Sequence, residues 1–224
     1  MKHLAIIFIV LMAVLVTGCA TNNAKFLDNF NGARPTSILI VPPLNEVTDV
    51  QASTSVLATL PYYLAEKGFY VFPVNTVKTL LEYEGYYEAA EVFAAPPEQL
   101  ANLFKADAIL YITIHEWTSK YIVLTASTEV DFEYKLVAAD GSLLWTQRLK
   151  AVYSPNNNGG GGGLAGLIVG AVQAAVERSA PTYIPLTKSL HTRAFLGPQG
   201  NKQSFPLGPY HPHYAEYYER MTLE

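Results

Sequence analysis

The sequence has 224 residues, a formal net charge of −4 and a single cysteine. The acidic balance argues against nucleic acid and anionic lipid headgroups as partners, and one cysteine excludes an intramolecular disulfide. With 15% charged residues and 15 tyrosines, the surface is expected to be poor in charge and rich in amphipathic rings, which protein interfaces favour.

Residues 1–18 have the layout of an export signal. Lys2 and His3 form a basic start, and an uncharged apolar run from Leu4 to Val16 follows. This run is shorter than the roughly 20 apolar residues that a membrane-spanning helix needs. We therefore expect a cleaved secretory signal rather than a transmembrane anchor.

The end of this segment predicts lipidation. The residues Val16-Thr17-Gly18-Cys19 resemble a lipobox, in which cleavage falls between Gly18 and Cys19. Cys19 would then carry a diacylglycerol and an N-acyl chain, which exceeds what stable membrane anchoring requires. Ala20 stands where an inner-membrane retention signal has Asp, so we expect outer-membrane sorting with the protein body in the periplasm.

Residues 19–36 are polar and irregular, and indicate a lipidated tether ahead of an α/β domain over residues 37–196. The first half of that domain alternates apolar runs with amphipathic stripes. Strands are predicted at 37–41, 69–72 and 106–114, and helices at 51–67, 76–83 and 97–104. Pro61 lies inside the first helix and predicts either a kink or a helix that begins there. This order is typical of parallel strands joined by right-handed crossovers.

The pattern changes after Lys120. From Ile122 to Ala138 apolar and polar residues alternate, which indicates a strand with one wet face. Ala139-Asp140-Gly141 supplies a tight turn, and Leu143 to Tyr153 returns as the hairpin partner. The predicted fold is a single α/β (α+β) domain with a mixed sheet. It has a parallel β-α-β first half, an antiparallel meander and helices packed on the sheet.

Beyond the meander the composition changes twice. Residues 154–163 are rich in Asn and Gly and predict a flexible loop; their five-glycine run lacks the spacing of a phosphate-binding loop. Residues 164–179 predict an apolar helix, and a further helix is expected from Ile184 to Leu196. Residues 197–224 predict an irregular tail.

Small residues recur at every fourth position along the apolar helix, at Gly162, Gly166, Gly170 and Ala174. Such a stripe lets another backbone approach closely. Two interpretations stay open: a helix buried against the sheet, and a self-association helix that produces a homodimer. Membrane insertion is a third, but the opening glycines would fray the first turn of a span that is already short.

No catalytic motif stands out, and no cofactor is expected. His115 and Glu116 are neighbours in a strand and point to opposite faces, so they cannot act together as an acid–base pair. His211 and His213 share one side of an extended tail, but a third metal ligand at suitable spacing is missing.

Three acidic residues offer the best case for an enzyme. Glu129, Asp131 and Glu133 share one strand face and are spaced by about 6.8 Å per two residues. That spacing could imitate the carboxylate pair of a glycosidase. A solvated strand face explains the three residues more simply.

Three segments resemble a conserved family of bacterial lipoproteins typified by the genome-derived neisserial antigen lipoprotein. They are Ile38–Pro43, Leu64–Val74 and Lys105–Ile112, followed by the glycine-rich helix. The family typically has Gly where this chain has Lys105. More distantly, the Val-Pro-Pro and Ala-Asp-Ala residues look like the curli secretion lipoprotein CsgG and the N-terminal domain of TolB.

The resemblance implies an α/β domain, a dimer, and a role in envelope transport or assembly beside other small lipoproteins. It supplies no catalytic residues. The leading hypothesis is therefore a non-catalytic scaffold anchored to the outer membrane. A periplasmic enzyme acting on cell wall or glycans, and a small-ligand carrier with a Tyr-lined pocket, remain the alternatives.

Overall fold

The computed structural model describes residues 22–122, 125–154, 182–197 and 204–221. The described strands form one six-stranded mixed sheet in the order β3-β1-β4-β5-β6, with β2 also paired to β4. Their bounds are β1 Ser37–Ile40, β2 Leu44–Asn45, β3 Tyr70–Val71, β4 Ala108–Ile122, β5 Thr125–Ala138 and β6 Leu143–Tyr153. This confirms the predicted mixed sheet with a parallel first half and an antiparallel second half.

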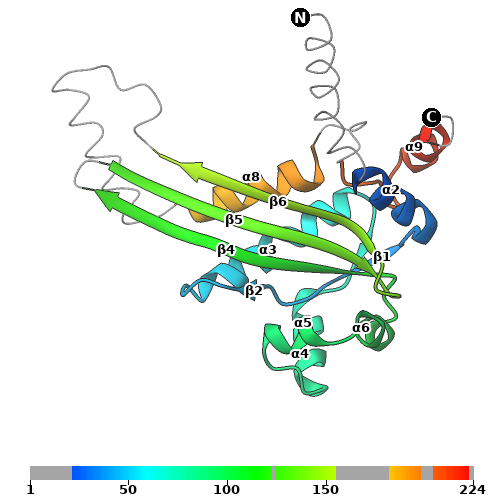
Figure 1. Cartoon of the computed structure of the whole chain (residues 1–224), viewed down its shortest axis with the longest axis horizontal. Coiled ribbons are helices and arrows are strands. Elements are labelled where there is room, and N and C mark those ends of the chain that lie inside the picture. The colour runs from blue at the N-terminus through cyan, green and yellow to red at the C-terminus, as the bar shows by residue number, and fades with distance from the viewer. Residues whose placement is uncertain (1–21, 123–124, 155–181, 198–203, 222–224) are drawn as a thin grey trace, which may run out of the picture.

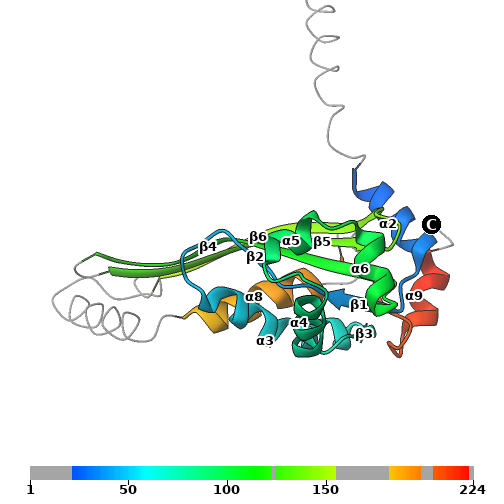
Figure 2. The same cartoon turned by 90° about the horizontal axis from the view of Figure 1, so that it is seen from below.

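Helices cover the sheet unevenly (Figures 1 and 2). Their bounds are α2 Asn22–Ala33, α3 Gln51–Glu66, α4 Val74–Tyr83, α5 Ala89–Ala94, α6 Pro97–Phe104, α8 Tyr183–Phe195 and α9 Tyr214–Met221. Helices α3 and α8 lie along one face, whereas the strands of the meander extend past them. Within the described ranges no helix is long and apolar enough to cross a membrane.

The parallel part follows the predicted elements closely. Strand β1 pairs in parallel with β3 and with β4, and all four of its residues are buried, as expected of a strand apolar on both faces. Helix α3 runs through Pro61 rather than beginning there. Gly68 follows it with φ of +84°, a conformation that glycine adopts without strain.

The meander is longer than predicted because β4 continues to Ile122. A bulge between Ile114 and Glu116 shifts the register, and such an extra residue exchanges the inward and outward positions of a strand. Trp117 therefore points into the core. The inward positions predicted for β5 are confirmed, since Val130, Phe132 and Tyr134 are fully buried, although Asp131 between them is also buried.

Two clusters of apolar side chains stabilise the sheet. The larger one joins the sheet to α3 and α8, and includes Phe30 of α2. The smaller one packs α4, α5 and α6 against the other face of β1 and of the first half of β4. Only the larger cluster continues along the meander of β4, β5 and β6. In the half of the meander far from β1, the other face therefore carries polar side chains.

The predicted domain limits were too narrow at both ends. Residues 22–33, expected to be part of an irregular tether, form α2, and Phe30 of that helix is 1% exposed. The expected irregular tail contains α9, and Phe205 is fully buried in the larger core. Each segment is ordered by a few apolar contacts with the domain, which composition alone does not reveal. Helix α5 was also missed.

Candidate functional site

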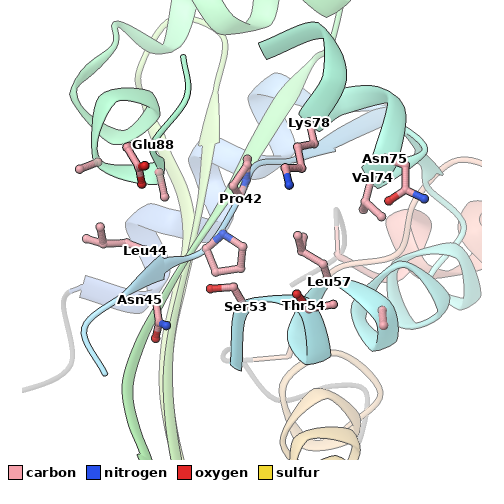
Figure 3. Close-up of a pocket in the computed structure, with 14 residues that line it drawn as sticks. Pro42, Leu44, Asn45, Ser53, Thr54, Leu57, Val74, Asn75, Lys78 and Glu88 are labelled. Atoms are coloured by element: carbon pink, nitrogen blue, oxygen red, sulfur yellow. The ribbon is translucent and has the colours of Figure 1, made fainter. Parts of the chain in front are cut away.

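A cleft lies at the carboxyl end of β1, where the chain leaves the strand through Pro42 and Pro43 (Figure 3). Its volume is about 660 Å³, within the range of small-molecule sites. The other lining residues are Leu44 and Asn45 of β2; Ser53, Thr54, Leu57 and Ala58 of α3; Val74, Asn75 and Lys78 of α4; and Glu88, Ala89 and Ala90 around the start of α5.

The topology of the sheet explains this position. Strand β1 lies between β3 and β4, and the chain reaches β3 through α3 and then β4 through α4, α5 and α6. The two connections therefore leave on opposite faces of the sheet beside β1. In open α/β sheets such a divergence leaves a crevice outside the carboxyl ends of the strands, where ligands commonly bind.

Eight of the fourteen residues that line the cleft are apolar, and the other six are polar or charged. Lys78 extends from α4 toward Pro42 (Figure 3) and makes an exposed 3.7 Å ion pair with Glu82 of its own helix. The Glu88 carboxylate already accepts the backbone N–H of Glu91 in a capping box at the start of α5. Lys78 is thus the lining charge best able to meet a ligand, which would be apolar with one negative group.

His115 of β4 links Glu46, which follows β2 at the edge of the cleft, to Glu133 of β5. Its Nδ1 lies 2.6 Å from Glu46 Oε2 and its Nε2 lies 3.3 Å from Glu133 Oε2. A neutral imidazole carries one N–H, so both contacts are hydrogen bonds only when the ring is protonated. Glu46 follows β2 directly, and its N–H donates to the Ile114 carbonyl. The adjacent Glu116 lies opposite Asp131 instead.

The three carboxylates of β5 are each paired with a base. Glu129 pairs with Lys150, Glu133 with Lys135, and Asp131 accepts two 3.0 Å hydrogen bonds from Arg148.

The hydrogen bond from Lys135 lowers the pKa of Glu133, and His115 adds to this against the opposing effect of burial. A glycosidase needs one carboxyl whose pKa is raised. The lowered pKa therefore does not suit Glu133 to the role of the general acid in such a pair.

The histidine pair of the C-terminal segment forms no metal site in the described structure. The rings of His211 and His213 lie 5.7 Å apart, and Nδ1 of His213 lies 3.3 Å from the Glu216 carboxylate. Across the described ranges, no three His, Cys, Asp or Glu side chains are placed to hold a metal ion. The predicted lipidation site (Gly18 and Cys19) and the predicted self-association stripe (Gly162, Gly166, Gly170 and Ala174) lie outside the described residues.

A buried polar chain that the sequence did not reveal ties α3, β5 and α8 together. Thr59 Oγ1 donates to the Ser55 carbonyl and so accepts from His191 Nε2 at 3.1 Å. His191 Nδ1 then accepts from the Tyr134 hydroxyl at 2.9 Å. Burial lowers the pKa of His191 to about 3, which keeps the ring neutral. Thr59, Tyr134 and His191 are far apart in sequence, and no local pattern marks them.

Comparison with known proteins gives one consistent result. Residues 27–196 match the family described as "Putative lipoprotein GNA1162-like". The chain belongs to this lipoprotein family. "Putative lipoprotein NMB1124/NMB1162" of Neisseria meningitidis is 37% identical over 173 residues, which cover 75% of this chain and 80% of the relative. The crystal structure of lipoprotein GNA1162 from the same species is also 37% identical, with a TM-score of 0.53, and the match covers 64% of this chain and 99% of that one.

Family membership confirms the resemblance inferred from Ile38–Pro43, Leu64–Val74 and Lys105–Ile112 and implies that lipid holds the chain at a membrane. All residues that line the cleft, and both carboxylates beside His115, fall inside the matched range. The C-terminal segment that contributes Phe205 and α9 falls outside it.

Proposed function

We propose that this lipoprotein is a non-catalytic scaffold or assembly component of an envelope transport or secretion system. Cys19 is acylated, the protein is anchored to the outer membrane, and its body faces the periplasm. Other envelope lipoproteins are its partners. Ala20 after Cys19, and the absence of Asp at that position, support the sorting.

One observation carries this proposal: the face of the meander that none of the described helices covers. Here the basic side chains Lys135, Arg148 and Lys150 are 52%, 56% and 53% exposed, whereas their acidic partners are only 11–25% exposed. The face therefore presents cationic groups held in fixed positions by carboxylates beneath them. Val152, opposite Glu129 in the register, is 56% exposed beside them. Charged groups fixed in position on such a face suit electrostatic recognition of a partner protein of complementary charge.

Site-specific photo-crosslinking in cells tests the scaffold role. A photoreactive amino acid at Lys135 or at Val152 should give discrete crosslinked products of higher mass, which mass spectrometry then identifies. The same amino acid at Tyr83, which is 84% exposed on α4, is the matched control and should give none. Equal crosslinking from all three positions, or none from any, contradicts the proposal.

The cleft supports a second candidate, a small-ligand-binding lipoprotein. Its apolar walls and Lys78 suit a ligand such as dodecanoate, which can be titrated calorimetrically. Ala58→Trp should fill the cleft and Lys78→Met should remove the charge, so each should weaken binding at least about tenfold. Lys105→Met, an exposed lysine outside the cleft, should leave it unchanged. A wild-type protein that binds no dodecanoate refutes this candidate.

The predicted homodimer rests on the stripe of Gly162, Gly166, Gly170 and Ala174. Leu side chains at two of these positions would prevent close approach of a second backbone. Gly166→Leu with Gly170→Leu should therefore lower the mass measured by light scattering for a chain that lacks residues 1–19. An unchanged mass means that this helix does not form the dimer.

A further inference from the structure

The C-terminal segment 204–221 is packed against the domain as a peptide ligand is packed in a groove. Residues 205–208, Phe-Pro-Leu-Gly, are all buried. The Phe205 ring lies 6.3 Å from that of Phe30, 5.7 Å from Phe69, and 4.9 Å from both Trp145 and Phe195. These four rings come from α2, the start of β3, β6 and α8, and they form an aromatic pocket around Phe205.

Backbone contacts fix the register of the segment beside this pocket. The Gly208 N–H donates to the Lys67 carbonyl at 2.8 Å, and the Tyr210 N–H donates to the Gly68 carbonyl at 3.0 Å. A Cβ on Gly208 would lie 2.3 Å from the Gly68 oxygen, so this position accepts only glycine. The groove therefore recognises an aromatic ring and, three residues later, a glycine.

The far end of the segment is held by α9. Leu207, Tyr217 and Tyr218 form a small buried cluster of their own. The Tyr218 hydroxyl donates to the Leu207 carbonyl at 3.5 Å, and the Arg34 guanidinium lies 5.2 Å from the centre of the Tyr218 ring. Arg34 directly follows α2, so this end of the segment also contacts the helix nearest the lipid anchor.

The walls of the groove lie inside the range that matches the family, and the segment lies outside it. The contacting wall residues are Phe30, Arg34, Lys67–Phe69, Trp145 and Phe195, and the matched range is residues 27–196. Pro206, Pro209 and Pro212 restrict the free segment to extended conformations, which reduces the entropy lost on docking. Recognition by a side-chain pocket and backbone hydrogen bonds is typical of peptide binding.

We propose that α2, the α3–β3 turn, β6 and α8 form a peptide-binding groove for an extended Phe-Pro-Leu-Gly segment. Its resident occupant is the C-terminal segment of the same chain, and the same segment of a second copy binds there in exchange. The groove belongs to the family domain, and this proposal does not depend on the scaffold role.

The test uses the full chain with a specific protease site placed within residues 198–203. After cleavage, a fluorescent peptide of residues 204–221 should bind saturably and be displaced by unlabelled peptide. The Phe205→Ala peptide should bind at least about 100-fold more weakly, because a buried ring is lost from its pocket. The Tyr210→Ala peptide, altered at a side chain that is 70% exposed, should bind within about threefold of the parent peptide.

Three results overturn the proposal. The cleaved segment fails to exchange with the added peptide over days, the Phe205→Ala peptide competes as well as the parent, or the body loses its circular dichroism once the segment is released. The last result would show that the body does not keep its fold without the segment, so that no groove exists apart from it. Exchange between copies has its own measurement: two differently tagged uncut chains, mixed at high concentration, should be recovered together, and Phe205→Ala in both chains should abolish this.

Discussion

At the scale of single residues, Asp107 organises the junction of β1 and β4. Its Oδ2 accepts from the backbone N–H and the hydroxyl of both Thr36 and Ser37, at 2.5–3.0 Å. Burial raises the pKa of Asp107, but these hydrogen bonds outweigh it, and the net pKa is lowered. This aspartate belongs to the Ala-Asp-Ala entry by which the sequence resembles its family.

Asp107→Asn should lower the free energy of unfolding by about 1–2 kcal/mol at pH 7, a modest value because the side chain is partly exposed. The pKa of Asp107 is lower in the folded protein than the value of about 3.9 in the unfolded chain. The ionised carboxylate therefore stabilises the fold above about pH 3.9, and this stabilisation is lost as the pH falls toward the folded pKa. The difference between wild type and variant should therefore shrink from pH 5 to pH 3 in urea titrations. A difference that stays constant over this range would show that the carboxylate charge is not the cause.

His191 changes stability with pH in the same direction, but through its neutral form rather than its charged form. Its pKa of about 3 in the folded protein lies below the unfolded value of about 6.5. The contribution of His191 to stability is therefore complete above about pH 6.5. It is lost as the pH falls, because the ring can take up a proton only in the unfolded chain. From pH 7 to pH 5 this group alone should cost about 2 kcal/mol.

His191→Phe should remove that part of the pH dependence, as measured by urea unfolding at pH 7 and pH 5. The variant is less stable at pH 7, because the Tyr134 hydroxyl loses its acceptor. Tyr134→Phe is the control: it should cost about 1 kcal/mol at both pH values and keep the wild-type pH dependence. The same pH dependence in His191→Phe and wild type would rule out His191 as the titrating group.

At the scale of elements, turns and bulges decide where strands and helices end. Gly68 and Gly85 both adopt positive φ just after a helix, at +84° and +93°. A Cβ on Gly68 would lie 2.2 Å from the backbone nitrogen of His211, whereas a Cβ on Gly85 would meet nothing within 4 Å. Substitutions at the two glycines therefore distinguish the effect of backbone strain from the effect of steric contact with the C-terminal segment.

Gly85→Ala should cost about 1–2 kcal/mol of unfolding free energy, the strain of a left-handed residue with a Cβ. Gly68→Ala should cost more, because it must also displace the segment that carries His211. Urea unfolding compares the two, and limited proteolysis should cut Gly68→Ala near residues 198–203 faster than Gly85→Ala. Equal costs would show that the segment does not restrain Gly68.

At the scale of the whole molecule, the two ends of the chain complete one core. Phe30 of α2 and Phe205 of the C-terminal segment are each at most 1% exposed, and their rings pack edge to face. The domain therefore closes by contacts between its first and last described segments. The range that matches the family includes Phe30 but ends before Phe205.

Phe205→Ala in the intact chain should lower the free energy of unfolding by about 3–5 kcal/mol, the usual cost of removing a buried ring. Tyr210→Ala, five residues along the same segment but 70% exposed, should stay within about 0.5 kcal/mol of wild type. Thermal unfolding followed by circular dichroism measures both. Similar midpoints for Phe205→Ala and wild type would show that the pocket closes without the ring.

Much of the fold was predictable because it rests on local patterns. The alternation along β5, the Asp140-Gly141 turn and the stripe of α3 depend on periodicities of two and 3.6 residues that a sequence displays directly. Helices α2 and α9 were missed because each presents only a few apolar residues to the core. The bulge after Ile114 also has no local mark, and it turned Trp117 inward.

Only part of the lining of the candidate site could be predicted from the sequence. The sequence placed Pro42 and Pro43 after β1, but the cleft needs α4 and the start of α5 to approach from the opposite face. The pairings of Glu46 with His115 and of Tyr134 with His191 join residues 69 and 57 positions apart. Long-range contacts of this kind depend on how the elements pack, which the patterns within each element do not specify.

By itself, the sequence indicated the lipoprotein family, most of the order of strands and helices and the mixed sheet, because the segments that resemble the family and hydrophobic periodicity are local properties. The tertiary structure alone decided that the cleft forms beside β1, that the carboxylates of β5 pair with basic side chains, and that Phe205 fills an aromatic pocket. The physical reason is the same in each case: burial and charge pairing join side chains that are distant in the chain, and their partners exist only once the sheet and its helices have packed.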